Sequence, residues 1–316
     1  MKLVAFFLAS ACVLAHAGEL RLDELGFPFR NRNLEIVWKT TTNRVPAMMN
    51  IYKAVPANFS HSLVTNLLAM GGFNEPEKVK NALAPALKGK DAAFEEIPAH
   101  KTISLSPSRG MALFFNTSRI PLPRQPEHGL PSDGPALKLA LETAKTLGIK
   151  TNDLARALDS DQFLVRRDKR ERGGLLNGKY TKRDIARGVY LYRAIDGIPV
   201  YGNGNCGGLY VNFGNDAQIA EVDMSWRNLE VKKRCPTATR DEVARRLRDG
   251  KAVIQIEGAD PARIKKITIL DMIPHYRTFP GDEAQAAIFP LLMIEATADL
   301  GDKAVPVTLF CPIIKE

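Results

Sequence analysis

The dipeptide Asp196-Gly197 separates two segments in which apolar and polar residues alternate, VYLYRAI and IPVYG. This pattern is typical of a two-residue β-hairpin, because both turn positions need a positive φ that Asp and Gly tolerate. Residues 101–118 alternate in the same way around SPSRG, and residues 264–279 and 286–298 read as the strands of a longer hairpin. The chain is therefore expected to build antiparallel sheets.

Helical periodicity is confined to a few short segments. Residues 60–72 carry apolar residues at helical spacing and end in Gly71-Gly72, and residues 136–149 do the same before Gly148. A short helix is predicted over 152–158. A further helix is predicted to begin at Thr239, which forms a capping-box pattern with Glu242.

The order of a helix followed by two to four strands recurs about three times, which predicts an α+β fold with helices packed on antiparallel sheets. Residues 34–43 and 47–55 read as two strands joined by a turn. Residues 120–135 (IPLPRQPEHGLPSDGP) resist both helix and central strand and indicate a linker. The predicted organisation is an N-terminal domain over 18–119 and one or more C-terminal domains over 136–316.

The first 17 residues, MKLVAFFLASACVLAHA, combine one lysine, a short apolar run and an Ala-His-Ala site. This is the pattern of a cleaved secretory signal peptide, and the run is too short for a permanent membrane span. No later segment has about 18 consecutive apolar residues. The mature protein is therefore expected to be secreted or periplasmic, with no transmembrane segment.

The formal charge of +9 is concentrated in two places, residues 166–187 and residues 232–248. Such runs favour acidic proteins, anionic polymers or membrane surfaces, although a solvated face is the favoured interpretation. Nucleic acid is not expected as a partner of an exported protein whose basic run lacks interleaved aromatics.

Three cysteines follow the predicted signal peptide, Cys206, Cys235 and Cys311. In an oxidising compartment they allow one disulfide and one remaining thiol. The spacing leaves the pairing open, and Cys206–Cys235 is the favoured hypothesis because both residues flank one predicted sheet segment.

Catalytic and cofactor motifs are weak. Gly202-x-Gly204-x-x-Gly207 has the spacing of a dinucleotide loop, but the residues after it alternate as a strand, whereas that motif needs a helix there. The loop is interpreted as a turn, and no histidine is brought near Cys206 by the sequence. Metal-ligand spacings and nucleophile motifs are absent, and the acidic pairs at 95–96 and 159–161 read as solvated. Neither cofactor nor metal is expected.

The segment VYLYRAIDGIPVYGNGNCGGLYVNFGNDAQ resembles the PepSY and fungalysin/thermolysin propeptide group. The similarity lies in Tyr192, in residues 196–202, in Val211 and Phe213, and in residues 214–216. Tyr276 and Pro290 are similar to the late hairpin of tandem-PepSY proteins. The resemblance implies two to three repeated units, each with a helix across an antiparallel sheet, and non-catalytic proteins that bind a peptidase or an envelope protein.

These observations predict an exported, non-enzymatic module that binds a protein partner, whether a peptidase or an envelope regulatory protein. A secreted hydrolase with scattered carboxylates and an envelope protein that binds an anionic polymer remain alternatives. An exposed hairpin or edge strand can dock by strand addition, while arginines select an acidic partner. The candidate binding residues are Asp196, Gly197, Pro199, Tyr201, Arg166, Arg167 and Arg170.

Overall fold

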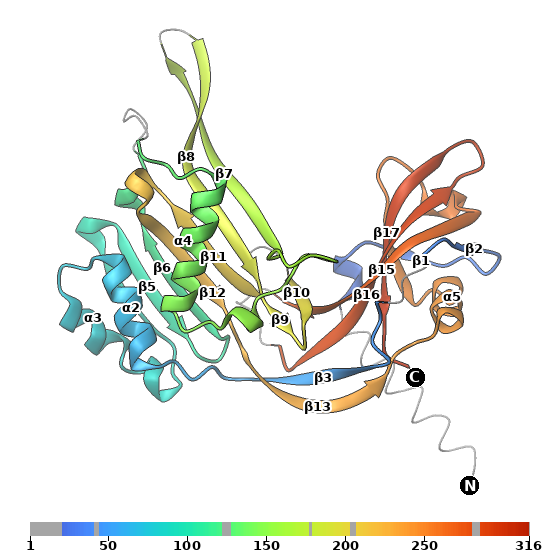
Figure 1. Ribbon diagram of the computed structural model, residues 1–316, viewed down its shortest axis with the longest axis horizontal. Helices are drawn as coiled ribbons and strands as arrows, with labels where there is room; N and C mark the ends of the chain where they lie inside the picture. The colour runs from blue at the N-terminus through green and yellow to red at the C-terminus, as the bar shows by residue number, and fades with distance from the viewer. Residues whose placement is uncertain are drawn as a thin grey trace. The chain divides into compact units, whose positions relative to one another are not determined.

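The computed structural model describes residues 21–40, 44–121, 128–176, 179–202, 207–279 and 285–315. The chain divides into two compact units. Figure 1 shows the chain with its colour running from blue at the N-terminus to red at the C-terminus. Unit 1 takes its described residues from 21–53, 230–277 and 287–315, and unit 2 consists of Ala54–Leu229 and Thr278–Ala286. The units do not divide at the predicted linker, because residues on both sides of 120–135 belong to unit 2.

The fold is mostly β, with two large sheets of ten and seven strands and four α-helices among the described residues. The expected α+β fold of two to three repeated PepSY-like units is therefore wrong. The hairpins that suggested repeats do form. However, they do not close as small separate sheets, because strands from distant parts of the chain join the same large sheet.

The sheet of unit 2 has the strand order β4-β5-β6-β12-β11-β8-β7, and all its neighbours are antiparallel. The predicted hairpin over 101–118 is confirmed as β5 and β6. The unit also holds the β9–β10 hairpin. The bounds are β4 (Ala92–Glu96), β5 (Lys101–Ser106), β6 (Met111–Asn116), β7 (Val165–Leu176), β8 (Lys179–Tyr192), β9 (Ala194–Ile195), β10 (Ile198–Gly202), β11 (Gly208–Phe213) and β12 (Ile219–Ser225).

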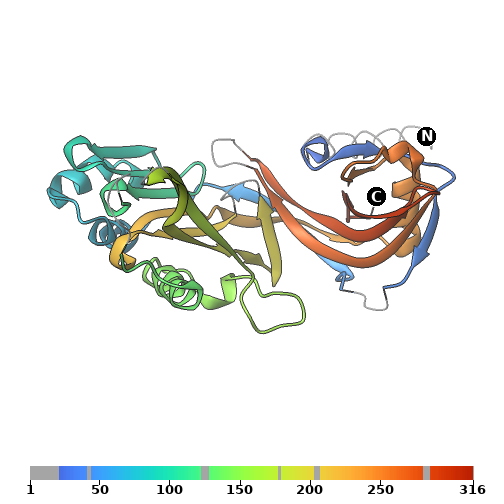
Figure 2. The same ribbon diagram turned by 90° about the horizontal axis from the view of Figure 1, so that it is seen from above.

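Three helices of unit 2, α2 (His61–Gly71), α3 (Pro76–Leu83) and α4 (Asp133–Thr146), pack with the sheet. Figure 2 shows α4 along one face of it. The Ser60 hydroxyl accepts a hydrogen bond from the Leu63 amide at the start of α2, and Gly72 ends it with φ 61°. The helix predicted over 152–158 is wrong, since only a 3-10 turn forms at Thr151–Asp153. Helix α3 was not predicted from the sequence.

One apolar core lies between these helices and the sheet of unit 2. It forms because residues two apart on a strand point to the same face, so each strand contributes every second side chain. The burial of β5 and β6 alternates accordingly. The strands contribute Ile103, Leu105, Phe114, Val189, Leu191, Leu209, Val211, Phe213 and Val222, and the helices contribute Leu63, Val64, Leu67, Leu68, Val79, Leu83, Ala136, Ala140 and Ala144.

The sheet of unit 1 contains β1, β14, β17, β16 and β15 in that order, all antiparallel, with β2 parallel to β15. β3 pairs with β13 and with the start of β16. The strands predicted over 34–43 and 47–55 therefore exist but do not pair with each other. The bounds are β1 (Phe27–Phe29), β2 (Glu35–Trp38), β3 (Met48–Val55), β13 (Asn228–Pro236), β14 (Ala252–Gln255), β15 (Lys266–Thr278), β16 (Ala287–Asp299) and β17 (Ala304–Pro312).

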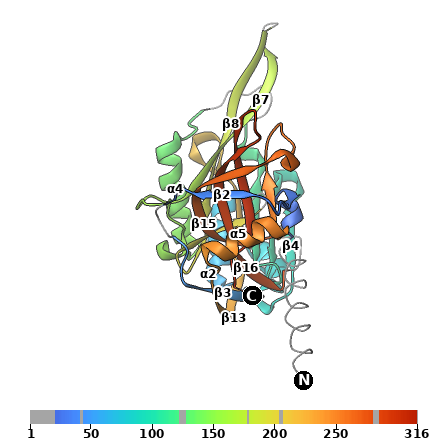
Figure 3. The ribbon, with the colours of Figure 1, turned by 90° about the vertical axis from the view of Figure 1, so that its right-hand side faces the viewer.

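Helix α5 (Arg240–Asp249) packs on β17 in unit 1, where Figure 3 shows it in front of the sheet. The predicted capping box is confirmed, because Thr239 and Glu242 exchange side-chain and backbone hydrogen bonds. The buried Arg246 donates to the carbonyl groups of Pro312 and Ile314. This arginine therefore fixes the last strand of the chain to the helix.

The histidine at position 275 makes unit 1 sensitive to acid. Burial, with a smaller contribution from Arg277, lowers the pKa of His275 to about 4. An unfolded histidine titrates near pH ~6.5, so the unfolded chain binds the proton first and stability is lost as pH falls from there towards 4. In the His275→Gln variant, we expect the free energy of unfolding to fall by ~1–3 kcal/mol less than in wild type over this pH range.

The measurement is urea unfolding at several pH values, followed by the fluorescence of Trp38 in a Trp226→Phe background. Trp38 belongs to unit 1 and Trp226 to unit 2, so the signal reports the unit that contains His275. Identical pH dependence with and without His275→Gln would contradict the assignment.

Candidate functional site

Polar and aromatic side chains form two rows across four neighbouring strands of unit 2. The first row is Arg166, Tyr190, Tyr210 and Asp223, and the second is Asp168, Gly188, Asn212 and Glu221, each directly opposite the next on β7, β8, β11 and β12. Alternation places both rows on the face opposite to the apolar core. We call Arg166, Asp168, Arg170, Tyr190, Tyr210, Asn212, Glu221 and Asp223 the polar face.

Two glycines let tyrosine rings lie directly on the backbone of this face. A Cβ at Gly188 would collide with the ring and hydroxyl of Tyr210, and a Cβ at Gly208 would collide with the ring of Tyr190. The two rings therefore cross between β8 and β11 in opposite directions. Glycine is required at both positions by close approach, since neither has a positive φ.

A chain of ring contacts joins the polar face to β10. The centroids of Tyr190 and Tyr192 are 4.6 Å apart and those of Tyr192 and Tyr201 are 5.4 Å apart, both edge-on. The Arg166 guanidinium carbon lies 5.0 Å from the centre of the Tyr190 ring, and its Nε lies 3.2 Å from Asp168 Oδ1. Burial opposes the charge of Arg166, but the hydrogen bond and charge of Asp168 prevail and raise its pKa.

The second row holds a buried amide beside a carboxyl with a shifted pKa. Asn212 is 2% exposed, and its Nδ2 donates to Glu221 Oε2 over 3.4 Å. Burial raises the pKa of Glu221, against the opposing effects of Asn212 and Arg170. Burial also raises the pKa of Tyr210 to about 12, with further contributions from the charges of Glu221 and Asp168. The pKa of Glu221 and that of Tyr210 therefore depend on the charged and polar side chains next to them on the polar face.

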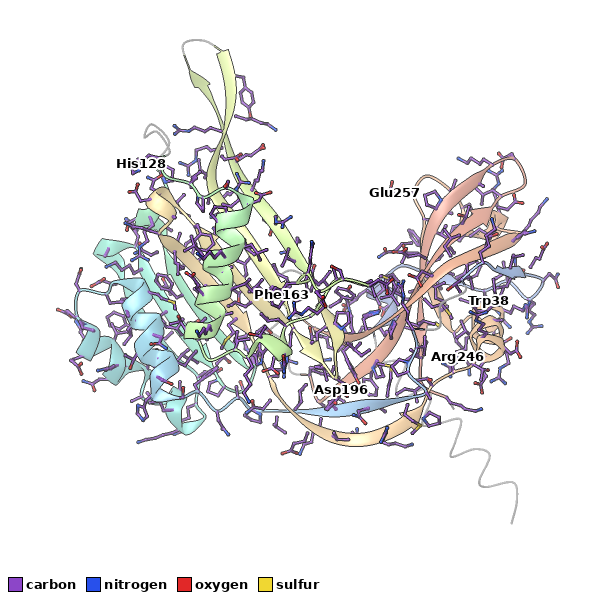
Figure 4. All side chains as sticks on the ribbon, viewed as in Figure 1. Trp38, His128, Phe163, Asp196, Arg246 and Glu257 are labelled. Atoms are coloured by element: carbon purple, nitrogen blue, oxygen red, sulfur yellow. The ribbon has the colours of Figure 1, made fainter. Side chains whose placement is uncertain are left out.

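The structure brings some of the predicted binding residues together and separates others. Tyr201, Arg166 and Arg170 belong to the polar face or to its aromatic chain, whereas Arg167 lies on the helix side of β7, opposite Val189. Asp196 and Gly197 form the turn of the β9–β10 hairpin with φ of 54° and 76°, as predicted, and Figure 4 labels Asp196 there. Pro199 lies beside this turn, opposite Ala194.

Four residues of the polar face were not among the binding residues predicted from the sequence: Tyr210, Asn212, Glu221 and Asp223. A signal was present, because alternation in GLYVNF puts Tyr210 and Asn212 on one face and alternation in IAEVDM does the same for Glu221 and Asp223. The acidic residues that were considered do not form such a site. Glu96 pairs with Lys101 over 3.2 Å, and Asp159 and Asp161 are exposed.

The cysteine predictions are tested only in part. Cys235 and Cys311 are both buried, free thiols, and burial raises the pKa of Cys311 to about 12. A thiol with such a pKa stays protonated and unreactive at neutral pH. Cys206 lies outside the described residues, as does most of the predicted glycine turn, although a strand follows it at Gly208 as expected.

Within the part of the chain that the structure describes, no group of three or more His, Cys, Asp or Glu side chains is placed to hold a metal ion. None of the helices described is both long and apolar enough to cross a membrane.

Replacing Glu221 should change how the stability of unit 2 depends on pH. Because burial raises the pKa of Glu221, the folded state binds a proton at a pH where the unfolded state has released it, and stability falls as pH rises through that window. We expect Glu221→Gln to match wild type below pH ~4 and to be more stable at pH 7. Thermal unfolding followed by Trp226 in a Trp38→Phe background measures this, and a less stable variant at pH 7 would count against it.

No protein-family model matches this chain, and no curated protein matches it. The crystal structure of an uncharacterized protein from Eubacterium rectale is similar over 88% of this chain and 86% of its own, with 12% identity and a TM-score of 0.41. A likeness at that level supports no argument about fold or activity.

Proposed function

We propose that this protein is an exported, non-enzymatic binding protein whose β7 edge receives an extended segment of an acidic polypeptide. The observation that supports the proposal is the position of β7, which ends the seven-stranded sheet and pairs with β8 alone. The export part rests on the signal-peptide pattern of residues 1–17.

The edge is long and its outer half stands apart from the rest of the sheet. β7 pairs with β8 from Val165 to Leu176, whereas β11 pairs with β8 only from Arg187 to Tyr192. Residues 171–176 and 179–184 thus form a two-stranded ribbon, which projects from the sheet in Figure 1. A ribbon of this kind is marginally stable alone, and an added strand would satisfy the outward backbone groups of β7.

The charge of the hairpin selects the partner. The segment from residue 165 to residue 187 contains nine basic and three acidic residues. Equal charges oppose pairing between two copies of this edge, while an acidic strand is attracted to it. Contrary to the expectation that this basic run lacks aromatics, it contains Tyr180, whose ring is 69% exposed and lies over Gly173 on the ribbon. Tyrosine and arginine, together with tryptophan, are enriched among the residues that contribute most to binding at protein interfaces.

The expectation of a peptidase or envelope regulator as the partner came from the PepSY resemblance, and the observed fold gives it no support. One of the two alternatives was an envelope protein that binds an anionic polymer. Such a polymer would bind the same basic side chains but would not pair with the backbone of the β7 edge. Salt separates the two, since binding by charge alone weakens steeply with ionic strength while paired backbone groups persist.

Reversing two charges on β7 should weaken binding of a strand-forming acidic peptide by at least about tenfold. Arg167→Glu with Lys169→Glu is suitable, because both side chains are exposed on the helix side of β7 and neither belongs to the polar face. The probe is a fluorescein-labelled peptide of alternating Val and Glu, about ten residues long and measured by anisotropy at 50 and 150 mM salt.

The matched control is Lys232→Glu with Lys233→Glu, which makes the same charge change at exposed positions of β13 in unit 1. This control variant should bind the acidic peptide as wild type does. A second control is a peptide in which every Glu is replaced by Lys, and wild type should not bind it. Equal weakening by both double variants, or binding of polyphosphate but not of the peptide, would overturn the proposal.

A further inference from the structure

The seven-stranded sheet of unit 2 ends in two edges of opposite charge. β7 forms one edge and β4 forms the other, and among the described strands each pairs with a single neighbour, β8 and β5 respectively. Residues 91–96 (DAAFEE) carry three acidic side chains and no basic one, whereas residues 165–170 (VRRDKR) carry four basic side chains and one acidic. Equal charges oppose the pairing of two identical edges, while the unlike edges of two molecules attract each other.

We propose that the β4 edge of a second copy of this chain is added to the β7 edge, so that the protein assembles head to tail. This inference rests on the proposed function and deepens it, because it uses the same β7 edge and names the acidic strand. The contact is heterologous: each molecule uses β7 towards one neighbour and β4 towards another. Assembly therefore does not stop at a symmetric dimer.

The two edges are regular over the same length. β7 pairs with β8 without interruption over residues 165–170, up to the β-bulge between Arg170 and Glu171. β4 pairs with β5 without interruption over Ala92–Glu96, and Asp91 comes directly before it. Residues 91–96 and 165–170 can thus pair backbone to backbone along their whole length.

The exposed side chains of the β4 edge form one acidic row. Phe94 packs against the apolar core, so alternation directs Ala93 and Glu95 to the face opposite to the helices. Asp91 lies on that face too, where its Oδ1 accepts a hydrogen bond from the Ser106 hydroxyl over 2.9 Å. All three are exposed. We call Asp91, Ala93 and Glu95 the β4 row.

The β7 edge carries a basic row with the complementary spacing. Arg166, Asp168 and Arg170 belong to the polar face, which is also opposite to the helices. When Ala93 is opposite Asp168, both arginines lie opposite the acidic residues of the β4 row, whether the strands run parallel or antiparallel. The small side chain of Ala93 also keeps a third carboxylate away from Asp168.

The same register keeps the two faces of the joined sheets aligned. It places Arg167 and Lys169 on the helix side, where the half-buried ring of Phe94 lies opposite one of them. A cation beside an aromatic ring is a favourable contact. A shift by one residue would bring the polar face of one molecule against the core side of the next, which alternation in both strands opposes. Charge and alternation therefore select one register independently.

The test is sedimentation velocity of residues 18–316 at several protein concentrations. We expect the weight-average mass of wild type to rise from that of a monomer at ~1 μM to beyond that of a dimer at ~100 μM. A salt concentration of about 50 mM keeps the charges of the edges effective.

Charge reversal at either edge should block assembly. Asp91→Lys with Glu95→Lys (the β4 variant) should weaken association at least about tenfold. It should still bind the acidic peptide of alternating Val and Glu, because its β7 edge is unchanged, and this binding shows that the variant is folded. Arg167→Glu with Lys169→Glu (the β7 variant) should lose both association and peptide binding.

The matched controls make the same charge changes at exposed positions of unit 1. Glu257→Lys with Glu295→Lys is the control for the β4 variant, and Lys232→Glu with Lys233→Glu is the control for the β7 variant. Both controls should assemble as wild type does.

A mixture of the two blocked variants distinguishes a head-to-tail contact from a symmetric one. The β4 variant has an unchanged β7 edge and the β7 variant has an unchanged β4 edge, so the mixture should associate at concentrations where each variant alone is monomeric. Three results would overturn the inference: wild type that stays monomeric at ~100 μM, a β4 variant that assembles as wild type does, or a mixture that stays monomeric.

Peptide binding separates the failure of this inference from that of the proposed function. If wild type binds the acidic peptide but remains a monomer, only the second copy is wrong as the partner. If wild type neither binds the peptide nor assembles, the β7 edge is not a docking site and both proposals are wrong.

Discussion

Strand β8 determines the architecture of unit 2 through the way its two edges are used. From Arg187 to Leu191 it is paired on both sides, with β7 and with β11, and this part carries side chains of the apolar core on one face and of the polar face on the other. From residue 179 to 186 it pairs with β7 only. β8 is therefore an interior strand of the sheet at one end and half of a two-stranded ribbon at the other. The polar face lies on its interior part, and the exposed edge of β7 runs along its ribbon part.

Close packing between tyrosine rings and glycines makes the polar face a defined surface. Tyr210 lies over Gly188 and Tyr190 lies over Gly208, so each ring is held by the backbone of the neighbouring strand. Edge-on contacts extend this order through Tyr192 to Tyr201. A row of rings held in this way loses little conformational entropy when a ligand binds, which is the condition for a preorganised site.

The sequence predicted correctly those features that depend only on interactions between residues a few positions apart. The hairpin turn at Asp196-Gly197 and the capping box at Thr239 depend on positive φ and on hydrogen bonds within a few residues, and both are present. The inference from these hairpins to repeated PepSY-like units was wrong because an Asp-Gly turn between alternating strands does not state which sheet the strands will join. β6 pairs with β12, more than a hundred residues later, and no local pattern announces this.

The sequence by itself determined the period-2 alternation of the strands, the turns and helix caps that bound them, and the excess of basic residues between 165 and 187. It did so because each depends on side-chain chemistry along a few neighbouring positions. Only the tertiary structure decided that Asn212 lies beside Glu221, that Arg166 lies over Tyr190, and that β7 ends the sheet. These relations follow from strand order and register, which the whole core sets when all strands bury their apolar face together.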